Sequence, residues 1–405
     1  MDIHVFSRAV HEAIPNLEAD ILNDKDLLVY PKNIGELSSF IKLCNDKKVG
    51  VVTVGGETHV GIHPEKAGVY LLTHDLSKII ELAKDDLTVT VEAGITIKEL
   101  AEALKKHNFL LPVSHHEKPD STIGGLLSRD AGGIEQYAYG TIHDYLLGLE
   151  FVTPTGELIK TGGKTVKNVT GYDFTRMFAK SWGSLGVITK ATFKLIPMPV
   201  EKVLFITYAT SITELAQQMQ DILSKRYALV TFMGMSGGFL GLAEGIEYGG
   251  VFVLAGSRQA VVHQLDSLES TMGIKHVLAG SNNVDKYLEG LLSDEHTELG
   301  DRNVEGDLIF GTDRKTLLNS LPKELDEIGR RYPMNILLDG GRNLVKLKDV
   351  HDHKLVKELR NLKKQVTVSF SDERAHVDIL YTRIKRALDP NMIMNPNNPK
   401  FVEVR

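Results

Sequence analysis

Three glycine-rich stretches are the parts of this sequence whose residue types and spacing could support chemistry. The first, VGGETHVG at 54–61, follows an apolar run, and the second is PDSTIGGLLSRDAGG at 119–133. The third is GGKTVKNVTGYDFTRMFAKSWGSLGVIT at 162–189. Glycines let backbone N–H groups approach a phosphate or a bulky planar ligand without side-chain obstruction. Each stretch alone is more often a tight turn, so the inference depends on their occurring together.

Two adjacent histidines and one arginine are the candidates for acid–base chemistry and substrate binding. His115 and His116 precede the second glycine stretch, and paired imidazoles can act as acid, base or donors to a carboxylate. A solvated polar loop is the alternative, because Glu117 is the only carboxylate beside them. Arg342, within LLDGGRNLVKL, has a fork of donors that suits a carboxylate, and an exposed hairpin arginine is equally compatible with the sequence.

The histidines and the single cysteine give no support for a metal site. His351 and His353 are two residues apart in a pattern typical of a helix, where such residues face different directions. Cys44 alone excludes an internal disulfide and a cysteine-ligated iron–sulfur cluster, which needs about four thiolates. We expect Cys44 to be a core residue and predict no metal.

Composition predicts a globular protein with no nucleic-acid partner. The 405 residues are 42% hydrophobic and carry a formal net charge of -6, whereas nucleic-acid binding favours a basic surface. The N-terminus lacks a signal-peptide pattern, and no apolar run reaches membrane-spanning length. We therefore expect a cytoplasmic location and no transmembrane segment.

The elements that must position the glycine stretches can be predicted from periodicity. Residues 34–44 have apolar positions at helical spacing, and the apolar run that follows them predicts a buried strand ending at the first stretch. LTVTVEA at 87–93 alternates like a strand, and Thr96 with Glu99 forms a capping-box pattern that begins a helix. Residues 146–161 predict a hairpin around Pro154-Thr155-Gly156.

A change of texture near residue 200 divides the chain. After Pro197-Met198-Pro199, residues 201–375 repeat a strand and helix texture twice, and the C-terminal residues predict a basic helix followed by a proline-rich tail. We expect a first domain over 1–200, an inserted domain over 201–375, and a segment over 376–405 that completes the first domain.

Together, in this order and spacing, the glycine stretches resemble the FAD-binding domain of the vanillyl-alcohol oxidase superfamily, particularly the FAD-binding subunits of glycolate oxidase. The resemblance covers roughly residues 28–200 and returns in the terminal LDPNMIMNP. KNVTGYDFTRMFAKSWGSLGVIT is its most diagnostic part. It implies an α+β protein with a PCMH-type FAD-binding domain of two α/β subdomains and an inserted α+β cap. No GxGxxG pattern follows a strand and opens a helix, so a Rossmann-type site has no support.

The resemblance also assigns cofactor contacts to positions of this chain. The implied FAD-binding residues are Thr53, Gly55, Gly56, Glu57, Thr58, His59, Ser121, Thr122, Ile123, Gly124, Gly125, Gly133, Tyr139, Gly140, Lys167, Asn168, Gly186, Ile188 and Asn395. Gly171, Tyr172 and Asp173 belong to the same implied turn as Lys167 and Asn168. Glu57 stands where relatives carry a third glycine, and repulsion from a phosphate predicts either that its carboxylate faces away or that the loop is adjusted. Because Glu57 also stands where berberine-bridge-like relatives attach the flavin through histidine, we expect noncovalent FAD.

By the same resemblance, the expected chemistry is oxidation of a small 2-hydroxy acid such as glycolate or lactate. The candidate catalytic residues are His115, His116 and Arg342. Electrons would pass from reduced FAD to a second flavin subunit, an iron–sulfur subunit or another acceptor, and such partners could hold the chain at a membrane surface. The GDGNLH-like string of related catalytic subunits is absent. A noncatalytic FAD-binding subunit and a stand-alone flavin dehydrogenase for another alcohol or acid therefore remain alternatives.

Overall fold

The fold is described from a computed structural model of the 405-residue chain. The structure describes residues 2–22, 24–58, 68–114, 118–163, 174–178, 181–236, 247–272, 274, 276–292, 308–329, 331, 335–339, 344–348, 353–361, 368–370 and 379–396.

The chain forms two compact units, each assembled from separate stretches of sequence. Unit 1 comprises residues 1–131, 141–197 and 375–405, and unit 2 comprises residues 132–140 and 198–374. From the sequence we predicted a domain boundary near residue 200 and a C-terminal segment, beginning near residue 376, that belongs to the first domain. The sequence does not predict that residues 132–140 pack with unit 2, because this short glycine-rich run has no periodicity to indicate which core it joins.

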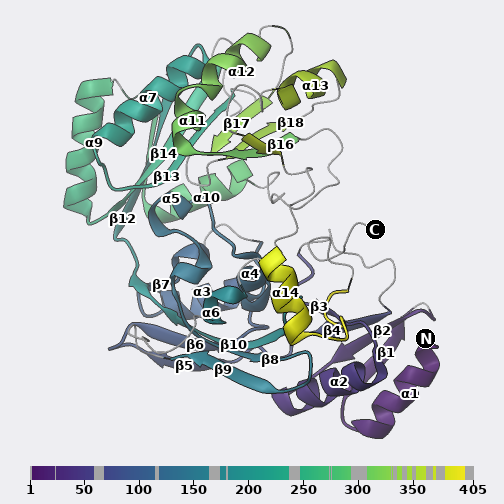
Figure 1. Ribbon diagram of the computed structural model, residues 1–405. Coiled ribbons are helices and arrows are strands. Elements are labelled where there is room, and N and C mark those ends of the chain that lie inside the picture. Colours follow the sequence, from purple (N-terminus) through teal and green to yellow (C-terminus); the bar gives the residue numbers. More distant parts are fainter. Residues whose placement is uncertain are drawn as a thin grey trace. The chain divides into compact units, whose positions relative to one another are not determined.

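The first half of unit 1 is a small mixed sheet with two helices. Its strands run in the order β1-β2-β4-β3, with β2 and β3 both parallel to β4. Asn33 caps the second helix, and the apolar side chains that the sequence places on one face are buried. The elements are α1 (Ile3–Ala13), β1 (Glu18–Leu22), β2 (Asp26–Tyr30), α2 (Ile34–Lys47), β3 (Val52–Val54) and β4 (Val69–Leu72) (Figure 1).

The second half of unit 1 is a five-stranded antiparallel sheet, in the order β5-β6-β10-β8-β9, with helices packed on its core. Val152 and Val187, at the ends of β8 and β10, belong to the core of the first half and so join the two sheets. The elements are β5 (Ile79–Ala83), β6 (Thr88–Glu92), α3 (Ile97–Lys105), β7 (Phe109–Leu110), η1 (Pro112–Ser114), α4 (Ile123–Arg129), η2 (Ile142–Asp144), β8 (Leu146–Val152), β9 (Leu158–Gly162), α6 (Phe174–Met177), β10 (Val187–Lys194), β11 (Ile196–Pro197) and α14 (Ile379–Leu388).

Unit 2 is an eight-stranded antiparallel sheet in the order β15-β12-β14-β13-β17-β18-β16-β19. Counted from the β13–β17 junction, both halves have the same strand order within a β-α-β-β-α-β unit, so the doubled texture in the sequence is a structural repeat. The elements are α5 (Gln136–Tyr139), β12 (Glu201–Ala209), α7 (Ile212–Ser224), β13 (Leu229–Ser236), β14 (Tyr248–Gly256), α9 (Arg258–Met272), β15 (His276–Ala279), α10 (Ser281–Leu292), β16 (Leu308–Thr312), α11 (Arg314–Leu318), α12 (Leu321–Gly329), β17 (Asn335–Asp339), β18 (Leu344–Lys348), α13 (His353–Asn361) and β19 (Val368–Phe370).

The two faces of the unit 2 sheet have different covers. Alternation along each strand sends Phe205, Phe232 and Phe252 to one face, where helices α7, α9, α11, α12 and α13 bury them. The opposite face is covered by apolar residues of α10 and by Ile134 and Tyr139 (Figure 1).

Most local elements predicted from the sequence are present. The helix at 34–47, the strand at 88–92, the hairpin of β8 with β9 and the C-terminal helix are confirmed. The Thr96–Glu99 capping box is also confirmed, with both reciprocal hydrogen bonds formed. Cys44 is fully buried, and burial raises the pKa of its thiol, which agrees with its assignment to the core. Among the described residues, no helix is both long and apolar enough to span a bilayer.

Candidate functional site: a cavity between two glycine loops

A cavity of about 160 Å³ lies in unit 1 where the two glycine loops meet. That volume is below the ~300–1,000 Å³ of whole cofactor pockets, so it suits only part of a dinucleotide. Strand β3 and the loop after it form one side, and α4 with the loop before it forms another. The lining residues are Val52, Thr53, Val54, Gly55, Gly56, Glu57, Thr58, Thr73, Ser121, Thr122, Gly124, Gly125, Ser128, Arg129, Trp182, Gly183, Gly186, Ile188 and Asn395.

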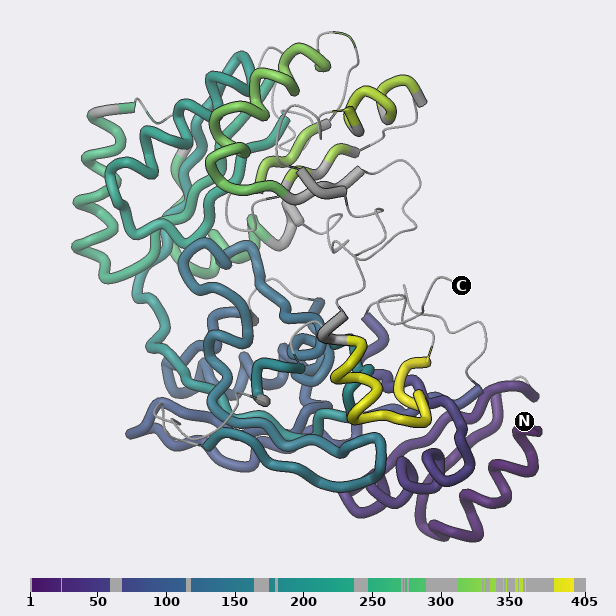
Figure 2. Tube along the Cα trace, in the orientation of Figure 1, coloured from purple at the N-terminus to yellow at the C-terminus, as the bar shows by residue number. Residues whose placement is uncertain are grey.

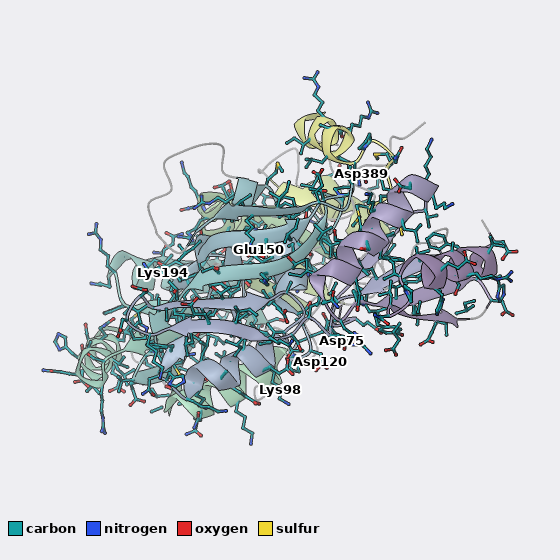
Figure 3. All side chains as sticks on the ribbon, turned by 90° about the horizontal axis from the view of Figure 1, so that it is seen from below. Asp75, Lys98, Asp120, Glu150, Lys194 and Asp389 are labelled. Atoms are coloured by element: carbon teal, nitrogen blue, oxygen red, sulfur yellow. The ribbon has the colours of Figure 1, made fainter. Side chains whose placement is uncertain are left out.

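Glycines 55 and 56 allow the first loop to lie directly against the second. A Cβ on Gly56 would overlap the carbonyl oxygen of Asp120, a residue labelled in Figure 3, and a Cβ on Gly55 would overlap the Thr122 hydroxyl. The loops are also joined by the Thr58 and Ser121 hydroxyls, whose oxygens are 3.1 Å apart. The Lys118 ammonium donates to the Thr58 carbonyl at 2.7 Å. Positions 55 and 56 therefore require glycine, because the backbone of the first loop lies too close to the second loop to leave room for a Cβ.

Helix α4 is held in place by backbone hydrogen bonds to the loop between β6 and α3. The amide of Ile123 donates to the Ile95 carbonyl at 3.0 Å, and the amide of Gly124 donates to the Ala93 carbonyl at 2.7 Å. Thr122 caps the helix by accepting from the Gly125 amide. The glycines at 124 and 125 face the cavity, whereas the Ile123 side chain is buried in the core of unit 1. Ile123 is thus a core residue that does not line the cavity, a difference from its expected place.

The C-terminal segment closes the cavity from a distant part of the sequence. The Asn395 amide side chain accepts from the Thr53 backbone amide at 3.2 Å and donates to the Trp182 carbonyl. The Asn395 backbone amide donates to the Val51 carbonyl at 2.8 Å. One asparagine therefore joins β3 to the residues before β10.

A buried ion pair fixes this segment. Lys385, 1% exposed, donates to the Ser184 carbonyl at 2.6 Å, to the Met394 carbonyl at 2.7 Å and to the carboxylate of Asp389. Asp389, labelled in Figure 3 near the end of α14, also accepts from the Met394 amide at 2.9 Å. Burial lowers the pKa of Lys385, and the Asp389 charge opposes this shift. The pair positions the backbone that carries Asn395.

Sequence reasoning missed seven residues of the cavity wall, which are Val52, Val54, Thr73, Ser128, Arg129, Trp182 and Gly183. Trp182, the only tryptophan, has a φ of 50° and donates its backbone amide to the Ser128 carbonyl at 3.0 Å. Arg129, in the last turn of α4, is 9% exposed and brings a positive charge to the wall. A lone tryptophan beside GSLG and a lone arginine within a glycine-rich loop were the available signals. Neither signal indicates which way the side chain points.

Glu57 takes a backbone conformation that glycine adopts more easily. Its φ is 53°, in the left-handed region, and its side chain is exposed. This conformation explains why a third glycine is expected at the position. Because its carboxylate reaches solvent, Glu57 can line the entrance without pointing at a bound phosphate.

The structure brings most of the predicted cofactor contacts together. The predicted residues that line the cavity are Thr53, Gly55, Gly56, Glu57, Thr58, Ser121, Thr122, Gly124, Gly125, Gly186, Ile188 and Asn395. Gly133, Tyr139 and Gly140 are not among the lining residues and belong to unit 2. The candidates that lie outside the described residues are His59, His115, His116, Lys167, Asn168, Gly171, Tyr172, Asp173 and Arg342.

The wall has polar groups that suit a dinucleotide. The Thr53 hydroxyl is buried and has no hydrogen-bond partner among the described residues, so it is available to a ligand. Arg129 supplies positive charge, and the glycine loops supply backbone without side-chain obstruction. In the part of the chain that the structure describes, no group of three or more His, Cys, Asp and Glu side chains could hold a metal ion.

His143 forms a separate buried pair in unit 1. Its Nδ1 lies 3.0 Å from an Asp130 carboxylate oxygen, and its side chain is 6% exposed. It is not among the residues that line the cavity. We therefore assign it no catalytic part.

Comparison with known proteins relates part of the chain to a family of FAD-binding domains. Residues 25–162 match the family described as the FAD binding domain. The chain is 34% identical to glycolate oxidase subunit GlcD of Bacillus subtilis over 203 residues, which are 50% of this chain and 43% of that protein. It is 36% identical to D-lactate dehydrogenase of Archaeoglobus fulgidus over 185 residues, 45% of this chain and 41% of that protein. The matches thus span less than half the length of these relatives.

Solved structures share the fold over nearly the whole chain. Chitooligosaccharide oxidase superposes with a TM-score of 0.67 at 14% identity, covering 98% of this chain and 100% of that one. Alkyldihydroxyacetonephosphate synthase superposes with a TM-score of 0.66 at 17% identity, covering 92% of this chain and 76% of that one. At these identities the likeness concerns the fold alone. Residues 25–162, which match the FAD binding domain family, contribute most of the residues that line the cavity, and they belong to a chain with an α+β fold.

Proposed function

We propose that the protein binds FAD noncovalently and oxidises a 2-hydroxy acid such as glycolate or lactate. The observation that carries the proposal is the cavity between the two glycine loops, because it lies largely within the segment matched to the FAD binding domain. The relatives named glycolate oxidase subunit and D-lactate dehydrogenase support the substrate class. The electrons would leave to a partner subunit or an external acceptor.

Different residues of the described cavity wall would contact different parts of the cofactor. The backbone at Gly55, Gly56 and Ser121, which lines the cavity, would lie against the pyrophosphate. Arg129 would offset part of the phosphate charge, and the Thr53 hydroxyl would donate to a ligand oxygen. The described lining contains no His or Cys, so it offers no side chain of the kinds that commonly link a flavin covalently.

The chemistry requires a hydride and a proton to leave the substrate. When bound, FAD supplies the hydride acceptor, so a 2-hydroxy acid becomes a 2-oxo acid as the flavin is reduced. The chain must hold the substrate carboxylate, a task that we assign to Arg342, whose forked donors suit it. The hydroxyl proton needs a base, which we assign to His115 or His116.

A second candidate function is an FAD-binding subunit that does not itself catalyse. Among the described residues that line the cavity, Glu57 and Arg129 alone are ionisable. Arg129 stays protonated and cannot act as a base, and Glu57 is exposed to solvent. Catalysis would then belong to a sister flavin subunit, with an iron–sulfur subunit carrying electrons onward. Such partners would also decide whether the assembly is held at a membrane surface.

Anaerobic reduction separates the candidates. The purified chain, loaded with FAD, is mixed in turn with glycolate, D-lactate and L-lactate, and the oxidised-flavin band near ~450 nm is followed. Bleaching by one acid supports autonomous catalysis and names the substrate. A band that persists with all three acids, yet bleaches when the partner subunits are added, favours the binding subunit. Bleaching by a different alcohol or acid alone would indicate a stand-alone dehydrogenase of another specificity.

The assigned residues are tested by the same assay. His115→Gln and His116→Gln should slow bleaching, and Arg342→Met should raise the substrate concentration needed for half-maximal rate. FAD affinity should stay unchanged in all three variants, because the proposal assigns these residues to the substrate and not to the cofactor. Unaltered rates in all three would remove the catalytic assignments while leaving FAD binding intact.

A further inference from the structure

A bulky residue occupies a turn position of the cavity wall that normally belongs to glycine. The amide of Ser184 donates to the Ser181 carbonyl at 3.0 Å, which closes a four-residue turn whose central residues are Trp182 and Gly183. Their φ angles are 50° and 70°, so both lie in the left-handed region, the pattern of a type I′ turn. Glycine, asparagine and aspartate dominate the central positions of such turns because they tolerate positive φ. A tryptophan there is strained, and Trp182 is the only one in the chain.

Segments that are distant in sequence hold this turn in place within unit 1. The Trp182 amide donates to the carbonyl of Ser128, in α4, at 3.0 Å, and the Trp182 carbonyl accepts from the Asn395 side chain. Figure 2 shows the yellow C-terminal segment, which carries Asn395, lying against the purple N-terminal part of unit 1. A Cβ on Gly183 would lie 2.8 Å from the Asn395 amide nitrogen and 3.8 Å from the Cβ of Thr53. The turn is therefore held on several sides, which is the condition under which backbone strain persists.

The two central residues of the turn have different surroundings. Gly183 leaves no room for a Cβ, whereas Trp182 is half-buried and lines the cavity. Residues held in rarely populated backbone conformations cluster at ligand-binding sites, where the strain is retained for the sake of a contact. FAD has a planar ring system on each side of its pyrophosphate, and a flat indole can stack on such a ring. Stacking of this kind is worth roughly fivefold or more in affinity.

We propose that Trp182 is a ligand-contacting residue whose indole stacks on a planar ring of FAD, either adenine or isoalloxazine, at the wall of the cavity. The inference rests on the proposed function, because it takes FAD as the ligand. It deepens that function by assigning a ring contact to a residue outside the segment 25–162 that matches the FAD binding domain. The strained turn is retained because glycine, which would relieve the strain, could not supply the ring.

Variants that keep or remove the ring test the contact on the full chain. Trp182→Phe keeps a flat ring on the same backbone, whereas Trp182→Gly and Trp182→Asn remove the ring and suit a positive φ. The dissociation constant for FAD is measured by calorimetry, and the midpoint of thermal unfolding is measured without ligand. Trp182→Gly and Trp182→Asn should each weaken FAD binding at least about fivefold, whereas Trp182→Phe should stay within about twofold of the wild type. The thermal midpoint of the two ringless variants should change by less than about 3 °C, because relief of strain offsets lost packing.

Leu87→Gly is the matched control for the change of backbone. Leu87 is also apolar and half-buried, with a φ of 51°, but it is not among the described residues that line the cavity. Glycine at this position relieves the same kind of strain away from the ligand. The FAD affinity of Leu87→Gly should therefore change by less than about twofold.

The two halves of the cofactor show which ring contacts the indole. ADP carries the adenine together with a pyrophosphate, and FMN carries the isoalloxazine together with one phosphate. Weaker binding of ADP by Trp182→Gly would assign the contact to adenine, and weaker binding of FMN would assign it to the isoalloxazine. Unchanged binding of both halves would overturn the stacking contact.

Other results would also overturn the proposal. FAD affinity equal to that of the wild type in Trp182→Gly and Trp182→Asn, with a lowered thermal midpoint, would mean that Trp182 only packs the turn. An equal loss of affinity in Trp182→Phe would mean that the ring is not the group that matters.

Failure of the proposed function gives a different result. A wild-type chain that binds no FAD would overturn both the proposed function and this inference. A wild-type chain that binds FAD, with Trp182 variants that bind it equally well, would overturn this inference alone. A chain that binds FAD but oxidises no 2-hydroxy acid would remove the proposed oxidation, and the ring contact would still be decided by the variants.

Discussion

Gly56 shows how one residue can set the geometry of the site. A Cβ at this position would overlap a backbone carbonyl of the second loop, and a backbone atom cannot move aside as a flexible side chain can. We expect Gly56→Ala to separate the loops, lower stability by ~1–3 kcal/mol and weaken FAD binding at least tenfold. FAD titration and thermal unfolding measure the two effects.

Gly163→Ala is the matched control for that variant. A Cβ at Gly163 would meet nothing within 4 Å, so this substitution should change stability by less than ~1 kcal/mol and leave FAD affinity unaltered. If the two variants behaved alike, contact between the loops would not be what requires glycine at position 56.

The pKa of Lys202 leads to a prediction about alkaline pH. Lys202, on β12, is 2% exposed, and its ammonium is 2.8 Å from a Glu135 oxygen and 2.9 Å from an Asp285 oxygen. Burial alone would lower the pKa of Lys202, but the two carboxylates outweigh it. Its pKa in the folded protein is raised above the ordinary value of 10.5, so the folded state keeps this proton longer than the unfolded state. The stability that results is fully present below about pH 10.5 and is lost as pH rises through the folded value. We expect the free energy of unfolding to fall more steeply above pH 10.5 in the wild type than in Lys202→Met.

Urea unfolding at several pH values provides the measurement. Taking the difference between the two proteins removes the contribution of other groups that titrate in this range, including Tyr145, Tyr248 and Tyr287. Parallel curves for the two proteins would contradict the assigned direction of the Lys202 pKa.

At the scale of elements, the C-terminal segment shows how a distant stretch of chain completes the cavity. Asp389 is fully buried and accepts both the Lys385 ammonium and two backbone amides. Removing one partner of a buried ion pair leaves the other charge uncompensated, which costs ~3–5 kcal/mol. Asp389→Asn should destabilise unit 1 by this amount and weaken FAD binding through displacement of Asn395.

An exposed ion pair provides the comparison. Glu18→Gln makes a similar carboxylate-to-amide change at a surface pair with Lys32, 2.9 Å away, where both side chains are more than half exposed. Its effect on the free energy of urea unfolding should stay below ~1 kcal/mol. A loss of similar size in both variants would argue against the buried pair as the anchor of the closing segment.

Elements with strong local signals were predictable from the sequence. The capping box at Thr96, the apolar face of α2 and the turn between β8 and β9 each depend on residues close together in the chain. The glycine loops of the cavity wall were predictable, because places where two backbone segments lie in close contact require glycine, and glycine is visible in the sequence. Trp182 and Arg129 were not, because their orientation depends on distant packing that periodicity does not encode.

At the scale of the whole molecule, the sequence predicted a division near residue 200. It did not predict that residues 132–140 pack within unit 2. The doubled strand and helix texture of residues 201–375 corresponds to a repeated β-α-β-β-α-β unit, which local patterns can reveal. Glu135 and Lys202 lie on opposite sides of residues 141–197 in sequence, so their pairing needed the three-dimensional fold.

The most direct test of the central claim is whether the purified chain binds FAD in unit 1. The visible spectrum is recorded before and after addition of FAD and removal of unbound cofactor, for the wild type and for Gly56→Ala. We predict one noncovalent FAD per chain, released on denaturation, and markedly less in the glycine variant. A folded wild-type protein that stays colourless and takes up no added FAD would contradict the account.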